Sequence, residues 1–378
     1  MNAKVRFALL FACDQLISAV WVAPLVVLFW RGIWDLLDAH FIPEHPAASA
    51  WSTLVEHFKR WQIVQYSVAW ILLCHFYSYI GAVLSVCHWR GVWEVLDIYT
   101  GTGPAGYAVS LVVGQVILWL LRSSKCASAP PQILFADIGR DIFETPSRFG
   151  FQLDNNRMAY IGDHVFTSVV PSTAAVCVWR GFWGLADLYF HPESFKESAM
   201  LSLIIGYCVY ALCMPLQACC NLLFREMIKL RSPTLSRIIL EDFIILIGNF
   251  GAIHVWRGVR MGLNLVLLPN NVNASLLVGH FCSFILLSFT LTSDSVQARG
   301  FSLTGALSKE GCLFENQFLR MFFSAPSDPQ YSSVRQAEHE TRPKLSRKIV
   351  KYRNAIVKLS LDEEDDRQGL VPAESSEA

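Results

Sequence analysis

The sequence predicts an all-α protein: a polytopic membrane helical bundle of about eight transmembrane helices, built from four two-helix repeats and followed by a cytoplasmic tail. Three observations predict it. Of the 378 residues, 53% are hydrophobic and only 16% are charged, and the mean hydropathy is +0.37. Apolar stretches near the length that crosses a bilayer, about 20 residues of helix, recur as far as residue 293. Among these stretches a Trp-Arg-Gly tripeptide occurs four times.

Composition also excludes several classes of protein. A soluble multidomain enzyme of this size would carry more charge. Lys plus Arg and Asp plus Glu number 31 each, so no net basic field is available to bind nucleic acid. The 12 Trp and 25 Phe exclude a disordered or fibrous chain. We therefore expect membrane lipids, and no nucleic acid, around this protein.

Hydropathy alone indicates seven membrane helices. The first begins after Met-Asn-Ala-Lys-Val-Arg and is too long, with no small-residue cleavage site behind it, to be a removable secretory signal, so we expect it to remain as an anchor. The seven stretches are roughly residues 7–30, 63–88, 105–121, 159–182, 198–224, 238–258 and 274–293.

The tripeptide marks an internal repeat. Its four copies are Trp30-Arg31-Gly32, Trp89-Arg90-Gly91, Trp179-Arg180-Gly181 and Trp256-Arg257-Gly258, called boxes below. Three boxes have a second Trp four residues after the first and an Asp eight residues after it, namely Trp34 and Asp38, Trp93 and Asp97, and Trp183 and Asp187. The fourth box has Arg260 and Asn264 at those places.

A proline follows every box before the next apolar stretch, at Pro46, Pro104, Pro192 and Pro269. Proline cannot continue a helix but is favoured at the start of one. The repeating unit is therefore helix, box, turn with proline, helix. It predicts repeats at about 7–61, 63–121, 159–224 and 238–293 within a transmembrane domain spanning 1–293.

Four such units require an eighth helix, which the alignment of Pro46 with Pro104 places at about residues 47–61. This segment carries Glu56, His57, Lys59 and Arg60, so hydropathy alone rejects it. Charges near a helix end can extend to the interface but do not lie unpaired in hydrocarbon. We therefore expect a short or half-crossing helix here.

The distribution of basic residues supports eight crossings with both termini in the cytoplasm. With that orientation Lys4 and Arg6, and the basic loops near 122–158 and 225–237, lie inside. The four boxes then lie at the outer interface. The sequon Asn273-Ala274-Ser275 falls in an outer turn, which makes Asn273 a candidate glycosylation site.

Two interpretations of the box are open. If the helix continues through it, each Arg and the Asp seven residues later, such as Arg31 and Asp38, lie on one face of the same helix two turns apart. The box is then an interface anchor, in which Trp fixes the depth and Gly allows close packing. Alternatively, the four arginines converge on a vestibule and bind an anion or a phosphate headgroup.

A second recurrent feature is acidic. Asp14 and Asp163 both stand 16 residues before the first Trp of their box, and Glu241 with Asp242 stands near the matching place of the fourth unit. Acids in the first turns of a helix interact favourably with its positive end. The alternative is a proton or cation site inside the bundle, which Asp14 favours most because an apolar helix precedes it.

No motif indicates catalysis, a metal or a cofactor. The 11 Cys form neither a Cys-x-x-Cys pair nor a Cys/His zinc pattern. A nucleophile elbow, a phosphate loop and a paired set of catalytic carboxylates are also missing from the sequence. We therefore expect neither a cofactor nor enzyme activity.

Beyond residue 293 the sequence predicts a cytoplasmic and mostly disordered tail, 294–378. Its segment 342–359 alternates Lys and Arg with Ile, Val and Leu, as in a basic amphipathic helix. Such a helix binds anionic membrane surfaces or a calmodulin-like partner. The alternative is a solvated tail without a partner.

The four boxes, the Trp and Asp behind three of them, the eight predicted membrane segments and the tail together resemble the Fuseless family of animal multi-pass membrane proteins. The resemblance covers roughly residues 7–293. It implies a presynaptic membrane protein that helps to organise the active zone. In that role it supports calcium-channel localisation and evoked transmitter release, with presynaptic calcium-channel or scaffold proteins as partners. The fourth box, which lacks the second Trp and the Asp, departs from the pattern of the other three.

Three classes of function remain open at this stage. A membrane organiser is favoured by the resemblance and by the predicted cytoplasmic loop and tail. A secondary transporter or channel for a small solute or ion is favoured by the internal repeat and the intramembrane acids. A lipid-modifying membrane enzyme has only the arginines in its favour.

Overall fold

The computed structural model describes residues 3–40, 68–134, 147–149, 151, 157–230 and 234–297. All of them belong to the first of two compact units, Met1–Arg320; the second is Met321–Ala378. The predicted helix at 47–61, the tail beyond 297 and its basic segment at 342–359 lie outside the described residues.

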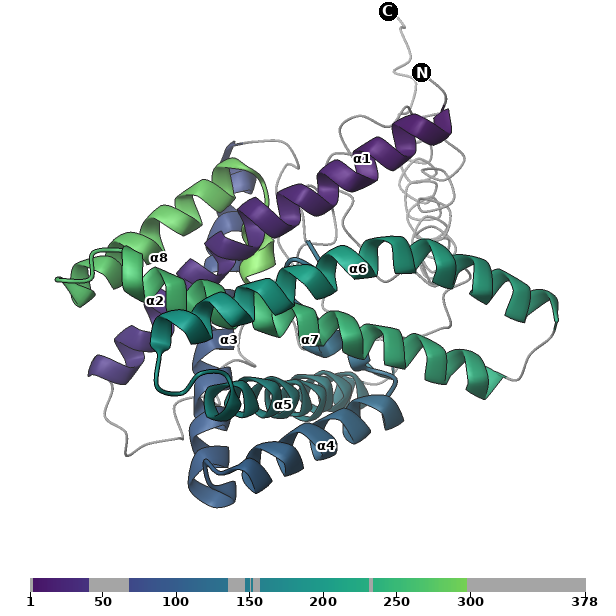
Figure 1. The fold of residues 1–378 in the computed structure, drawn as a ribbon, viewed down its shortest axis with the longest axis horizontal. Coiled ribbons are helices and arrows are strands. Elements are labelled where there is room, and N and C mark those ends of the chain that lie inside the picture. Colours follow the sequence, from purple (N-terminus) through teal and green to yellow (C-terminus); the bar gives the residue numbers. More distant parts are fainter. Residues whose placement is uncertain are drawn as a thin grey trace, which may run out of the picture. The chain divides into compact units, whose positions relative to one another are not determined.

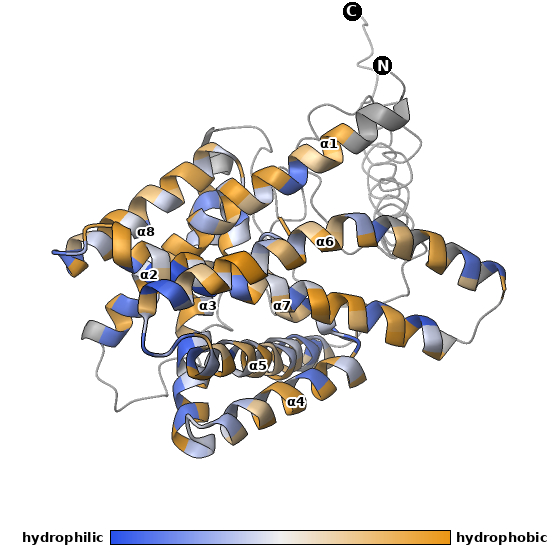
Figure 2. Ribbon diagram, viewed as in Figure 1, coloured by the Kyte–Doolittle hydropathy of each residue, from blue (hydrophilic) through white to orange (hydrophobic). Residues whose placement is uncertain are grey.

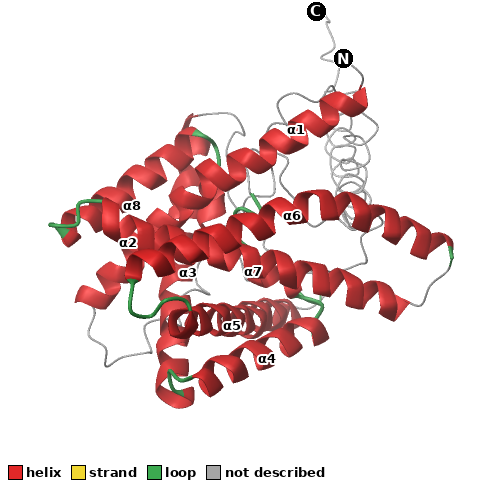
Figure 3. Cartoon of the chain, in the orientation of Figure 1, coloured by secondary structure: helices red, strands yellow, loops and turns green. Residues whose placement is uncertain are grey.

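The described part of the chain is helical and contains no strand, as the sequence predicts (Figures 1 and 3). A π-helical turn, η1 (Ser18–Val22), joins the first two helices, and two short 3₁₀ turns are η3 (Ser124–Ala127) and η4 (Ser293–Val296). The helices are α1 (Ala3–Ile17), α2 (Ala23–His40), α3 (Val68–Thr100), α4 (Pro104–Leu120), α5 (Arg157–Tyr189), α6 (Phe195–Lys229), α7 (Thr234–Val266) and α8 (Val272–Phe289).

Six helical segments in the described residues are long and apolar enough to cross a membrane. Helix α4 is also apolar but shorter. Each of the seven stretches indicated by hydropathy thus overlaps one of the described helices. The helices that carry the boxes continue through them, so that α3 runs to Thr100 and α5 to Tyr189. Proline marks the next start as expected, because α4 begins at Pro104 itself. The total of eight crossings stays a prediction, since 47–61 is not described.

The helices are apolar on the outside, and polar side chains are buried among the hydrophobic core inside. Large hydrophobic side chains such as Ile204, Leu212 and Phe289 are exposed, whereas Ser78, Asn249 and Arg180 are fully buried. Figure 2 shows the resulting predominance of hydrophobic residues along the helices. This distribution fits an integral membrane protein, whose outer surface contacts lipid and whose buried polar groups must bind each other.

Within the described residues, three of the four box helices pack along a helix from the neighbouring repeat. The pairs are α2 with α8, α5 with α4, and α7 with α6, and the last two pairs are easily followed in Figure 1. The box glycine makes this approach possible. A Cβ added at Gly32, Gly181 or Gly258 would lie 2.6 Å from His280 Cβ, 2.5 Å from Leu111 Cβ or 2.6 Å from Leu203 Cγ, respectively. Gly91 is the corresponding residue of α3.

Two segments predicted to lie in the cytoplasm are instead packed inside the bundle. Residues 123–134, part of the predicted loop 122–158, are mostly buried, and Ser124 and Ala127 are at most 1% exposed. Residues 294–296 are also buried, so the packing of the described chain continues through Val296, beyond the predicted boundary between bundle and tail at 293/294. Hydropathy missed both segments because their polar groups are satisfied by the helices around them.

Close packing at the box glycine predicts a difference between two glycines of α7. We expect Gly258→Ala to lower the free energy of unfolding by about 1–3 kcal/mol, because the new methyl group overlaps Leu203. Gly262→Ala is the matched control, since a Cβ there meets nothing within 4 Å. It should be neutral or stabilising by up to about 1 kcal/mol. Thermal unfolding of the two purified variants tests this, and equal effects would contradict the packing described.

Candidate functional site

The first Trp of each box meets the other three in a closed ring at the centre of the bundle. The ring centroids of Trp30 and Trp89 are 5.4 Å apart, those of Trp89 and Trp179 5.4 Å, those of Trp179 and Trp256 5.0 Å, and those of Trp256 and Trp30 5.6 Å. Every pair is edge to face, the arrangement that the aromatic quadrupole favours. The ring brings together α2, α3, α5 and α7.

A second layer lies one helical turn further along the same four helices. Trp34 packs edge to face on Trp93, and Trp93 on Trp183, with centroids 5.6 and 6.3 Å apart. The fourth place is taken by Arg260, whose guanidinium carbon lies 5.7 Å from the Trp34 ring and 5.9 Å from the Trp183 ring. A cation thus closes the second layer through its contacts with two aromatic faces.

The box arginines bind acids of neighbouring helices. Arg90 Nε donates to Asp38 at 2.6 Å, Arg180 Nε to Asp97 at 2.8 Å and Arg257 Nε to Asp187 at 2.8 Å. Arg31 Nε closes the cycle by donating to the amide oxygen of Asn264 at 2.6 Å. Asp38, although it lies on the same helix as Arg31, therefore binds the arginine of the next box.

Serines on the second helix of each pair supply further hydrogen-bond acceptors to the box arginines. Arg180 Nη1 donates to Ser110 on α4, and Arg257 donates to Ser198 and Ser202 on α6. Arg31 Nη2 donates to Ser275 on α8 at 3.1 Å. A regular spacing in the sequence marks these serines. One stands six residues after each of the four prolines, at Ser52, Ser110, Ser198 and Ser275.

Burial excludes a lipid-facing anchor as the role of the box. The four Trp of the first ring are between 4 and 6% exposed, and Arg31, Arg180 and Arg257 are at most 3% exposed. An interface belt would place these side chains at the headgroups instead. The hypothesis that four arginines converge on one anion also needs revision, because three of them already bind a carboxylate.

Residues 123–134 and 294–296, called the first and second inner segments below, approach the first Trp ring and accept hydrogen bonds from its indoles. Trp179 Nε1 donates to the carbonyl of Ala127 at 2.8 Å, Trp256 Nε1 to that of Pro130 at 2.6 Å, and Trp30 Nε1 to that of Val296 at 2.7 Å. Trp89 Nε1 is buried and has no hydrogen-bond partner in the described parts of the chain. The Trp ring therefore organises loops as well as helices.

Three of the four recurrent acids hold chain segments in place. Asp163 accepts hydrogen bonds from Ser147 and from the backbone amides of Phe149 and Phe151. Glu241 and Asp242 bind the guanidinium of Arg122 at 2.7 and 2.9 Å, and Ser124 donates to Asp242 at 2.8 Å. Asp14, the fourth, is fully buried in α1.

The predicted place of these acids in the first turns of their helices is wrong. α1, α5 and α7 begin well before them, at Ala3, Arg157 and Thr234, and none of these helices has an acid in its first turn. Their charge is instead used inside the bundle, where a carboxylate needs hydrogen-bond donors or a cation. For Asp163, Glu241 and Asp242 those donors come from the loops they hold.

A cavity of about 450 Å³ opens among the two Trp layers. Its polar lining includes Arg31, Asp97, Asp187, Arg260 and Asn264, and Cys126 and Ser128 of the first inner segment also border it. Burial raises the pKa of the Cys126 thiol to about 12, so this side chain is neutral at ordinary pH.

The described residues contain no group of three His, Cys, Asp or Glu that could hold a metal ion. Asn273 lies apart from the cavity lining, exposed in the first turn of α8.

The apolar helices and their buried ring of charged and aromatic side chains define an α-helical, polytopic membrane protein. The family model described as Fuseless matches residues 9–297, and the chain belongs to the Fuseless family. The match ends at residue 297, where the described part of the bundle also ends. No curated protein and no solved structure matches the chain.

The indole hydrogen bonds predict different effects of the same substitution at two ring positions. We expect Trp179→Phe to lower the free energy of unfolding by about 1–3 kcal/mol more than Trp89→Phe, because it leaves the buried carbonyl of Ala127 without its donor. Trp89→Phe removes an indole of similar burial that donates to no described partner. Thermal unfolding of both variants in detergent measures the difference. Equal losses would mean that these hydrogen bonds do not hold the inner segment.

Proposed function

We propose that this protein is a non-catalytic membrane organiser of the presynaptic active zone. In this proposal it supports the localisation of calcium channels there and thereby sustains evoked transmitter release. Membership of the Fuseless family is the observation that carries the proposal. We place the protein in the plasma membrane of nerve terminals with both termini in the cytoplasm, which agrees with the basic residues of the predicted inner loops.

The architecture limits where such an organiser can contact its partners. Part of the predicted cytoplasmic loop after α4 is engaged within the bundle, since residues 123–134 are mostly buried. The sequence beyond 297 is then the largest cytoplasmic stretch in this topology. We propose that it binds presynaptic channel or scaffold proteins. Its basic segment 342–359 suits a calmodulin-like partner or the anionic inner leaflet.

A rescue experiment tests this proposal. Nerve terminals that lack the protein are expected to show reduced calcium-channel density and reduced evoked calcium entry. The intact chain should restore both, whereas a chain truncated after Gln297 should not. Truncation at 297 rather than 293 is essential, because Val296 accepts the hydrogen bond of Trp30 and belongs to the bundle.

Two controls sharpen the outcome. Surface labelling shows whether the truncated chain reaches the membrane, and a full-length chain with the basic residues of 342–359 changed to Gln separates the charge of the tail from its presence. Rescue by the truncated chain would locate the activity in the bundle and refute a tail-based organiser. Normal channel density without the protein would refute the organiser altogether.

A secondary transporter or channel for a small solute or ion is the second candidate function, and the cavity of about 450 Å³ favours it. The first inner segment, residues 123–134, borders this cavity through Cys126, Ser128 and Ala129. Solute passage would therefore require this segment to move. Proteoliposomes test this candidate: it predicts a flux that Arg260→Gln, in the cavity wall, changes. The same slow leak in protein-free and protein-containing vesicles would refute it.

A further inference from the structure

The cavity at the Trp layers has the size and lining of a small-molecule site. Its volume of about 450 Å³ lies within the range of about 300–1,000 Å³ typical of ligand pockets. Trp side chains of all four boxes form its walls together with Tyr107 and Phe195. A few polar groups, above all Arg260 and Asn264, interrupt this aromatic surface.

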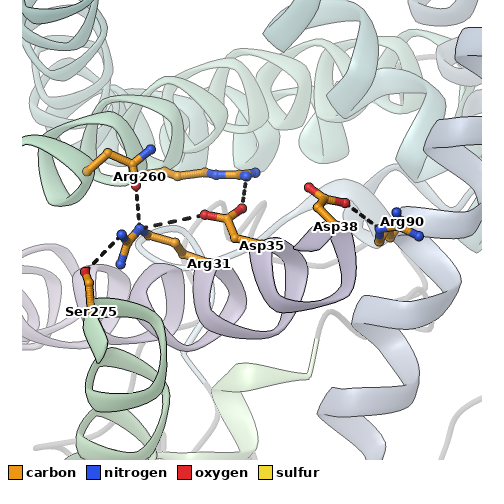
Figure 4. Close-up of polar contacts among 7 residues, drawn as sticks. Arg31, Asp35, Asp38, Arg90, Arg260 and Ser275 are labelled. Atoms are coloured by element: carbon orange, nitrogen blue, oxygen red, sulfur yellow. Dashed lines mark hydrogen bonds and ion pairs between the residues drawn. The ribbon is translucent and has the colours of Figure 1, made fainter. Parts of the chain in front are cut away.

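The charges around the cavity do not balance. Arg180 and Arg257 are each bound to a carboxylate, Asp97 and Asp187, so those two pairs are neutral. Asp35, in contrast, interacts with two arginines at once. It is hydrogen-bonded to Arg260 and lies 3.9 Å from Arg31 Nε (Figure 4). Within the described residues, the cluster of Arg31, Asp35 and Arg260 therefore carries a net formal charge of +1.

The fourth box creates this excess through its two departures from the repeat. Asn264 stands where the other boxes have an Asp, so Arg31 receives a neutral amide in place of a carboxylate. Arg260 stands where the others have a second Trp, which adds a cation. Both changes make the same side of the cavity more positive.

The cluster also has unused hydrogen-bond donors. Arg31 is 3% exposed, and its Nη1 has no hydrogen-bond partner in the described parts of the bundle. Arg260 lines the cavity and its side chain is 27% exposed. Its hydrogen bond to Asp35 uses one of its nitrogens, Nη2. An unpaired charge in a low-dielectric site is costly, and a bound anion removes that cost.

We propose that this cavity binds a small organic anion with a flat apolar body, such as an aromatic carboxylate. The carboxylate binds Arg260, with Arg31 and the Asn264 amide behind it, since guanidinium groups suit planar, forked anions. The apolar body packs against the Trp walls. Aromatic walls by themselves also suit an organic cation, but the excess positive charge favours the anion.

Direct binding to the intact protein tests the proposal. The full chain is reconstituted in phosphatidylcholine nanodiscs and titrated with phenylacetate and with benzylamine, a cation of similar size and ring, by isothermal titration calorimetry. We expect saturable binding of phenylacetate and none of benzylamine. Preferential binding of benzylamine, or no saturable binding of either probe, would overturn the proposal.

Variants that restore the repeat give the sharpest comparison. Asn264→Asp supplies Arg31 with the carboxylate that the other three box arginines have, and it removes the excess charge. We therefore expect it to weaken phenylacetate binding by about tenfold or more while unfolding at the same or a higher temperature. Arg260→Gln should weaken binding similarly and provides a second test if Asn264→Asp folds poorly.

Arg90→Gln is the matched control. It removes a box arginine that binds Asp38 but does not line the cavity, so phenylacetate affinity should stay within about twofold of that of the unmodified chain. Unchanged binding in both Asn264→Asp and Arg260→Gln would overturn the proposal. A second titration in nanodiscs containing phosphatidylserine distinguishes the sources of the carboxylate. Competition by this lipid assigns the site to a headgroup, and undiminished binding assigns it to a soluble anion.

Discussion

The structure depends on the neutralisation of buried guanidinium groups. Arg180 and Arg257 are essentially inaccessible, and a guanidinium cannot lose its charge to escape burial. Each must therefore receive a carboxylate and further acceptors from elements around it. Asp97 and Ser110 supply them for Arg180, and they come from two different helices, α3 and α4. One side chain thus fixes the mutual position of three helices.

The Trp layers act on the same helices in a second way. Edge-to-face packing of bulky indoles sets the spacing of α2, α3, α5 and α7. Their Nε1 groups, once buried, need acceptors, and the backbone carbonyls of Ala127, Pro130 and Val296 provide them. This need explains why chain segments that hydropathy assigns to water lie inside the bundle. The acids Glu241 and Asp242 then secure one of these segments through Arg122.

Much of this arrangement could be predicted from the sequence, and the part that could not has a definite cause. Apolar stretches gave the helices, and the repeated box indicated residues that meet at one site. The partner of each arginine does not follow from the sequence, because a strict repeat keeps the spacing of Arg31 to Asp38 constant whether the pair forms within a unit or between neighbours. Only contacts between helices distinguish the two cases. The serines were overlooked although their distance from the prolines is constant, because a lone serine in an apolar helix carries little signal.

The closure of the cycle between α2 and α8 has a consequence for how the protein is made. Arg31 leaves the ribosome well before its partners Asn264 and Ser275, which lie 233 and 244 residues later in the chain. During synthesis the first box therefore lacks these partners until the later helices are inserted, and Asp35, one turn away on the same helix, is the acid nearest to Arg31 in the sequence. Assembly is completed only when the final hairpin is inserted. A chain that stops earlier presents an unsatisfied intramembrane cation, a feature by which the biosynthetic machinery can distinguish unfinished molecules from finished ones.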